Sequence, residues 1–157
     1  MNNKYINIYN NLVNLTRNKK LYKNFSKQDT FSDRLIFFLF HFAFFLKVFK
    51  KTNEKKILQE IYDYTFKYLE LSVREMGYGD ATINKKMKNY LNIFHSILDK
   101  INNWEETSDS NKAKVLSDFL NIDRNISNLI DYFDNYLVNL SNNTLNFYLK
   151  GVIKDKF

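Results

Sequence analysis

His41 and His95 are the two histidines of this chain, and histidine is the side chain best suited to general-base chemistry near neutral pH. His41 follows Arg34 by seven residues, so on a helix the two side chains share a face about 10 Å apart along the axis. His41 also stands inside an apolar run, where its ring must find hydrogen-bond partners or stay neutral. A buried structural histidine is the first interpretation, and a polar point on a binding or helix-packing surface is the second.

A charged stripe at helical spacing follows the apolar run: Asp63, Lys67, Glu70 and Arg74. Glu70 precedes Arg74 by four residues, which is the favourable order for an ion pair on a helix. Such a stripe is usually a solvated helix face, where each pair contributes only a few tenths of a kcal/mol. The alternative is that Arg74 and Glu75 brace the corner that comes directly after them.

That corner is the segment 74–80, with the sequence Arg-Glu-Met-Gly-Tyr-Gly-Asp. Gly77 suits the left-handed position just past a helix end, where a side chain costs energy. We expect Gly79 to let the backbone turn again, and Asp80 to cap the next helix by accepting hydrogen bonds from its free N–H groups. The segment therefore predicts a tight corner between two helices.

Lysines gather in two places, although the net charge of +7 fits the codon usage of an AT-rich genome equally well. Lysines in the first turns of a helix oppose its macrodipole, which favours an anionic partner slightly. One cluster lies at the start of the helix after the corner and consists of Lys85, Lys86 and Lys88. The other follows the apolar run and consists of Lys47, Lys50, Lys51, Lys55 and Lys56.

Recognised catalytic and metal-binding patterns are missing from the sequence. It has no phosphate-binding loop, and Gly77-Tyr78-Gly79 stops short of a dinucleotide fingerprint. The absence of cysteine excludes disulfides and thiol chemistry, and no histidine–carboxylate pair has the spacing of metal ligands. Because these patterns are missing, we expect no catalytic residue, metal or cofactor. A haem held between His41 and His95 is a minor alternative.

The elements that position these residues are all predicted to be helical. A chain of 157 residues with three glycines and no proline has too few turn signals for a β fold, and one domain is expected. Apolar residues recur at steps of three and four, and in the segment 54–76 they form one stripe: Leu58, Ile61, Leu69, Val73 and Met76. The prediction is a single compact all-α domain of about six helices. Their approximate ranges are 4–15, 31–51, 54–76, 81–103, 112–122 and 124–150. A short helical piece is expected near 19–24, and Thr30 with Asp33 is expected to form a capping box for the second helix.

The apolar run over residues 35–46 is too short to cross a bilayer, which takes about twenty residues. A buried central helix is expected there, with an interfacial helix as the alternative. The sixth helix could pack on the core or serve as a dimer or partner helix, because its apolar spacing is coiled-coil-like. With no signal-peptide pattern at the N-terminus, we expect a cytoplasmic protein, with a peripheral position at the inner face of the cytoplasmic membrane as a further option.

Between Tyr9 and Ile126 the sequence resembles the ubiquinol–cytochrome c chaperone family. The positions that carry the resemblance are Thr16-Arg17, Leu21-Tyr22, Asp29-Thr30-Phe31, Arg34, His41, Asp63, Glu70, the segment 72–80, Lys85-Lys86, Phe94 and Arg124-Asn125-Ile126. Glu70 stands where the family usually has Asp, and three sites depart further from the family pattern: Ser32-Asp33 replaces an acidic-Gly pair, Asn84 replaces a glycine, and His95-Ser96-Ile97 replaces an aromatic-Gly-Arg string. The last departure weighs against a ligand role for His95.

The resemblance implies a non-catalytic chaperone that binds newly made cytochrome b, an apolar client, and promotes assembly of respiratory complex III. It is compatible with a ribosome or a membrane surface as a further partner. We expect a groove lined by Phe, Leu and Met near the second helix and the corner. The residues assigned to client binding or to the family motif are Arg34, His41, Asp63, Glu70, Arg74, Glu75, Gly77, Gly79, Asp80 and Lys86.

Three other functions stay open from the sequence. The first is a membrane-peripheral helical adaptor unrelated to complex III. The second is a small helical enzyme acting on an isoprenoid or quinone, which would need Arg34, His41 and Asp63 in one pocket. The third is a nucleic-acid binder, but the aromatic residues fall at core spacing and no specific nucleic-acid partner is expected.

Overall fold

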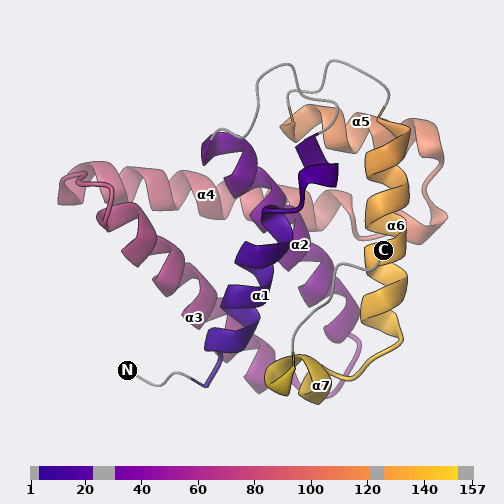
Figure 1. Cartoon of the computed structure of the whole chain (residues 1–157), viewed down its shortest axis with the longest axis horizontal. Coiled ribbons are helices and arrows are strands. Elements are labelled where there is room, and N and C mark those ends of the chain that lie inside the picture. Colours follow the sequence, from indigo (N-terminus) through magenta and orange to yellow (C-terminus); the bar gives the residue numbers. More distant parts are fainter. Residues whose placement is uncertain (1–3, 23–30, 121–125, 152–157) are drawn as a thin grey trace.

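The computed structural model describes residues 4–22, 31–120 and 126–151 (Figure 1). Within these ranges every regular element is a helix, which confirms the all-α prediction. The α-helices are α1 (Ile6–Thr16), α2 (Phe31–Phe49), α3 (Lys55–Arg74), α4 (Asp80–Lys100), α5 (Asp109–Phe119), α6 (Ser127–Ser141) and α7 (Leu145–Lys150), with 3-10 turns at Lys19–Tyr22 and Trp104–Glu106. Thr30 of the expected capping box, Asp29, Arg124 and Asn125 lie outside the described residues.

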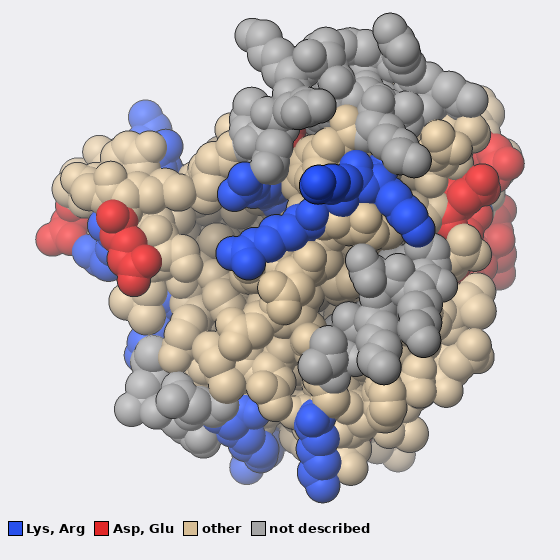
Figure 2. Space-filling view, in the orientation of Figure 1, with Lys and Arg blue, Asp and Glu red and all other residues tan. Residues whose placement is uncertain are grey.

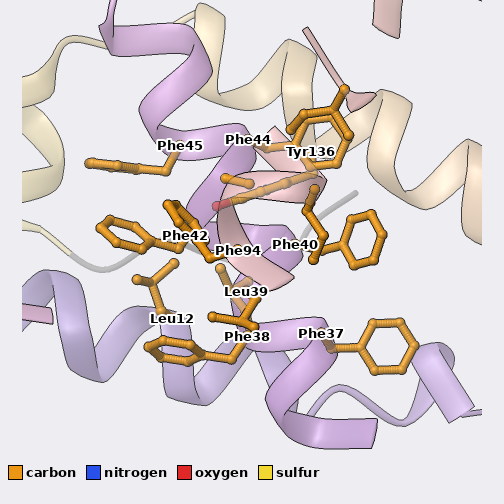
Figure 3. Close-up of a cluster of buried hydrophobic side chains, with 14 of the residues drawn as sticks. Leu12, Phe37, Phe38, Leu39, Phe40, Phe42, Phe44, Phe45, Phe94 and Tyr136 are labelled. Atoms are coloured by element: carbon orange, nitrogen blue, oxygen red, sulfur yellow. The ribbon is translucent and has the colours of Figure 1, made fainter. Parts of the chain in front are cut away.

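The centre of the fold is α2, whose apolar residues cover all sides of the helix and not a single stripe. Figure 3 shows its phenylalanines directed to opposite sides, with Phe37 and Phe40 on one side and Phe42 and Phe45 on the other. Phe42 stacks on Phe94 of α4, with ring centroids 5.3 Å apart. Helices α1, α4 and α6 pack around α2 and bury it, since a helix that is apolar all round needs cover on every side. The prediction of a buried central helix is confirmed.

None of the helices in the described ranges combines the length and the apolar character that a membrane span requires. The apolar run within α2 is thus used for the core of the domain, as the buried side chains of residues 37–45 show.

Helices α3 and α4 form the two arms of a V whose tip projects from the body of the molecule (Figure 1). The apolar stripe of α3 is buried as predicted at Leu58, Ile61, Leu69 and Val73. The expectation that Met76 continues this stripe is wrong, because α3 ends at Arg74 and the Met76 side chain is 48% exposed.

The expected single helix over 124–150 is two helices. The first, α6, ends at Ser141, and Thr144 begins α7 by accepting a hydrogen bond from the N–H of Phe147. The apolar seam of α6 faces the core, where Phe133 stacks on Phe44 of α2 with centroids 5.2 Å apart. Asn11 of α1 holds the end of α7 by donating to the Gly151 carbonyl at 2.9 Å. Core packing is therefore the role of this seam.

Candidate functional site

The tip of the V is built by a backbone turn at Gly77. The N–H of Gly77 donates to the Arg74 carbonyl, and Gly77 has a φ of +92°. This conformation is costly for any residue with a side chain, because Cβ would crowd the following carbonyl. The predicted left-handed glycine past the end of the helix is confirmed.

The predicted role of Gly79 is not the one observed. Gly79 has φ −74° and ψ 162°, a conformation that residues with side chains adopt readily, and a Cβ there would meet no atom within 4 Å. The turn needs only one glycine, Gly77. Gly79 instead leaves a stretch of bare, solvent-facing backbone at the tip.

Asp80 does not cap α4, contrary to the expectation. Gly79 holds the N-cap position, and Asp80 is the first residue of the helix. The Asp80 carboxylate accepts a hydrogen bond from the Arg74 guanidinium at 2.5 Å, while Arg74 lies 3.9 Å from Glu70. Arg74 thus joins the end of α3 to the start of α4, and its hydrogen bond with Asp80 raises its pKa. Its neighbour Glu75 is exposed on the same tip.

Large apolar side chains are exposed around this tip. Met76 is 48% exposed, Tyr78 44% and Leu71 38%. The Lys86 ammonium lies 4.7 Å from the centre of the Tyr78 ring, a cation–π contact that orients the tyrosine. Acidic and basic side chains surround the tip (Figure 2, left). We call Leu71, Arg74, Met76, Tyr78 and Lys86 the corner surface.

His41 lies in the core with no exposed surface. Its Nδ1–H donates to the Phe37 carbonyl at 2.6 Å, and Nε2 accepts from the Tyr132 hydroxyl at 2.7 Å. Tyr136 donates to the His41 carbonyl at 3.0 Å and ties α6 to α2. Burial lowers the pKa of the imidazole to about 4, so the ring is neutral at physiological pH. His41 is a core histidine with both ring nitrogens bonded, the first of the two interpretations.

Arg34, His41 and Asp63 do not share a pocket. Arg34 is exposed in the first turns of α2, His41 is in the core, and Asp63 lies on the exposed face of α3, where it accepts from Gln59 at 3.0 Å. The juxtaposition that the enzyme alternative needs is therefore not found. His95 is exposed on α4 and bonds to the Tyr62 hydroxyl, whereas both ring nitrogens of the buried His41 bond to protein groups.

A groove of about 500 Å³ lies beside the end of α2, between the start of α3 and the end of α4. It borders the second helix, as expected, but it sits at the end of α3 and α4 away from the corner. Its lining residues are Leu46, Lys50, Lys55, Leu58, Gln59, Tyr62, Phe94, His95 and Leu98. Sequence reasoning missed this site because three separate helices contribute to it. The lysine cluster at 47–56 was the one signal that pointed there.

Charge is distributed unevenly over the front of the molecule (Figure 2). A band of Lys and Arg crosses this face, and Arg17, Lys19 and Lys20 are exposed where α1 ends. Acidic side chains gather at the right edge of the same view. The basic face and the acidic edge make the charge distribution asymmetric, which the net charge of the chain does not show.

Comparison with known proteins gives one positive result. The sequence profile of the ubiquinol–cytochrome C chaperone family matches residues 23–146, which is well over half of the chain. No curated protein and no solved structure matches the sequence. The matched region holds α2 through α6, and with them the Gly77 turn, the Arg74–Asp80 pair and the buried His41. The chain belongs to the ubiquinol–cytochrome c chaperone family and, as a member, has a chaperone role in complex III assembly.

Proposed function

We propose that this chain is a non-catalytic chaperone that binds newly made cytochrome b and holds it until complex III assembles. The observation that carries the proposal is the family match over residues 23–146. Cytochrome b is an apolar helical client, and such a client requires a partner that offers exposed apolar side chains on a rigid frame.

The corner surface is the part of the chain we assign to this client. Met76 and Tyr78 are large apolar side chains that lie exposed two residues apart, and neighbouring exposed apolar groups are typical of a contact surface. The Arg74–Asp80 pair and the left-handed turn at Gly77 join α3 to α4. We propose that they help to hold the angle between the two helices, so that less of the surface has to be ordered on binding. Bare backbone at Gly79 lets a client helix approach closely.

Of the other motif residues, Glu70 supports Arg74, and Glu75 and Asp80 provide acidic groups beside the apolar surface. Arg34 and Asp63 are exposed on α2 and α3 and are proposed to contact partners outside the corner. A basic front face fits a position against the ribosome or the anionic inner face of the cytoplasmic membrane.

The assignment is tested with a photo-cross-linking amino acid placed at Tyr78 in cells that make complex III. We expect a cross-link to cytochrome b that disappears when translation of cytochrome b is blocked. The same amino acid at Lys114, which is exposed on α5, is the matched control and should give no such product. A cross-link of equal yield from both positions, or from neither, would reject the corner surface as the client site.

A further inference from the structure

The groove beside the end of α2 has the composition of a small-molecule site. Its volume of about 500 Å³ falls within the range of ligand pockets, which runs from roughly 300 to 1,000 Å³. Leu46, Leu58, Phe94 and Leu98 make its lining mainly apolar. A groove of this volume is too small for a protein domain and large enough for a small amphiphile.

Two lysines on the groove form no ion pair with an acidic side chain of the described residues. Lys50 directly follows the last residue of α2, Lys55 begins α3, and both side chains are exposed. Among the described residues neither forms an ion pair, whereas Lys47 nearby lies 3.1 Å from Glu105 and donates to the Asn102 carbonyl. The charges of Lys50 and Lys55 are therefore available to an anion at the mouth of the groove.

A second hollow of about 430 Å³ continues from the first. The two share Lys50 and Leu98, and the second adds Lys47, Lys51, Asp99 and Asn102. Three lysines against one aspartate make this extension positive on balance, even with Glu105 beside Lys47. The positive potential is thus concentrated at the α2 end of the groove.

The lining of the groove includes one polar pair whose groups bond to each other. The Tyr62 hydroxyl and His95 Nε2 are 2.9 Å apart, and both residues line the groove. Their hydrogen bond satisfies each of them internally. The apolar part of the floor therefore favours binding of an apolar chain that displaces water. The lysines favour a ligand with an anionic end.

We propose that the groove formed by α2, α3 and α4 binds a free long-chain fatty acid, with the acyl chain on the apolar floor and the carboxylate between Lys50 and Lys55. This site lies apart from the corner surface and does not depend on the proposed client. The proposal rests on two separate properties: an apolar floor, and two exposed lysines that form no ion pair within the described part of the chain.

The test is titration calorimetry of the full chain with dodecanoate below its micelle concentration. We expect saturable one-to-one binding, at least tenfold weaker binding of octanoate, and at least tenfold weaker binding of dodecyltrimethylammonium. The chain-length effect follows because each buried methylene changes affinity by roughly fourfold. The cationic amphiphile has the same chain but meets like charge at the lysines.

The matched variants are Lys50→Glu with Lys55→Glu, and Lys85→Glu with Lys88→Glu on the exposed start of α4. Both pairs change the net charge equally, and all four side chains are exposed, so folding should be kept in each. The first pair should weaken dodecanoate binding at least tenfold, and the second should leave it within about twofold. A doxyl-labelled fatty acid should also broaden the NMR methyl signals of Leu46, Leu58 and Leu98.

Absence of dodecanoate binding, an equal loss in both double variants, or broadening of other methyl groups would overturn the proposal. Binding of the chain to phosphatidylglycerol vesicles without binding of free dodecanoate would also overturn it, because a bilayer surface would then be the ligand.

Discussion

At the scale of single residues, His41 shows how the core uses a polar group. Both ring nitrogens form hydrogen bonds, one to the Phe37 carbonyl and one with the Tyr132 hydroxyl, and the second bond links α2 to α6. A buried polar pair of this kind stabilises only while every member is bonded. Protonation of the ring would add a buried charge and turn Nε2 from an acceptor into a donor.

The first prediction concerns the pH dependence of stability. The folded-state pKa of His41 is lowered to about 4 from 6.5, so the unfolded chain binds the proton more readily. The stabilisation is complete above pH 6.5 and is lost as the pH falls toward 4. Between pH 7 and pH 5 the titration of His41 should lower the free energy of unfolding, measured with urea, by about 2 kcal/mol. Below pH 6.5 the slope should approach about 1.4 kcal/mol per pH unit.

The His41→Gln variant should lack this part of the pH dependence, although it is less stable than the parent at pH 7. His95→Gln, which changes an exposed histidine, is the control and should keep the parent's dependence. If His41→Gln and the parent lose the same free energy over this pH range, the buried neutral histidine is not its source.

The second prediction compares the two glycines of the corner. Gly77→Ala should destabilise the fold by about 1 kcal/mol or more, because φ is +92° there. Gly79→Ala should leave stability unchanged or raise it by up to about 1 kcal/mol, since the backbone is ordinary and the space is open. Thermal and urea unfolding of the two variants measure this, and equal destabilisation by both would contradict the account.

At the scale of elements, the apolar spacing predicted the helical segments and the face that α3 buries, but not the division between α6 and α7. Leu58, Ile61, Leu69 and Val73 lie on one face of α3 because burial follows a local period that the sequence displays. Helix ends were harder to predict. Asp80 looks like a cap, but its carboxylate pairs with Arg74, a contact that depends on where the turn places both residues.

The break between α6 and α7 was missed for a similar reason. Residues 142–144 are Asn-Asn-Thr, which carry neither the glycine nor the proline that usually marks a helix end. The chain turns there so that Tyr148 of α7 covers Phe45 and Phe49, at ring-centroid distances of 6.2 and 5.7 Å. The position at which α6 ends thus depends on tertiary packing, which the local sequence does not show.

The third prediction tests that break. Thr144→Ala removes the hydroxyl that accepts from the Phe147 N–H, and should cost about 1 kcal/mol. The loss should appear as faster hydrogen exchange in α7 with little change in α4. Ser108→Ala, which removes the corresponding cap of α5, is the control and should speed exchange in α5 only. Faster exchange across all helices in Thr144→Ala would mean that α7 does not open by itself.

At the scale of the whole molecule, α2 organises a domain in which the corner and the groove lie at opposite ends of α3 and α4. The core could be predicted from the sequence because α2 is apolar on every side. The groove could not, since Leu46, Leu58 and Leu98 belong to three helices whose relative positions no local pattern records. The corner was found through its glycine and through the family resemblance.

The role in complex III is tested most directly by reduced-minus-oxidised spectra of membranes from a strain that lacks this chain, with and without a plasmid copy. The account predicts loss of the complex III cytochrome b signal, unchanged terminal oxidase signals, and restoration by the plasmid. Restoration should fail, or fall well below the parent's, when the plasmid carries Met76→Asp with Tyr78→Asp, which places charge on the corner surface. An unchanged cytochrome b signal in the deletion strain would contradict the account.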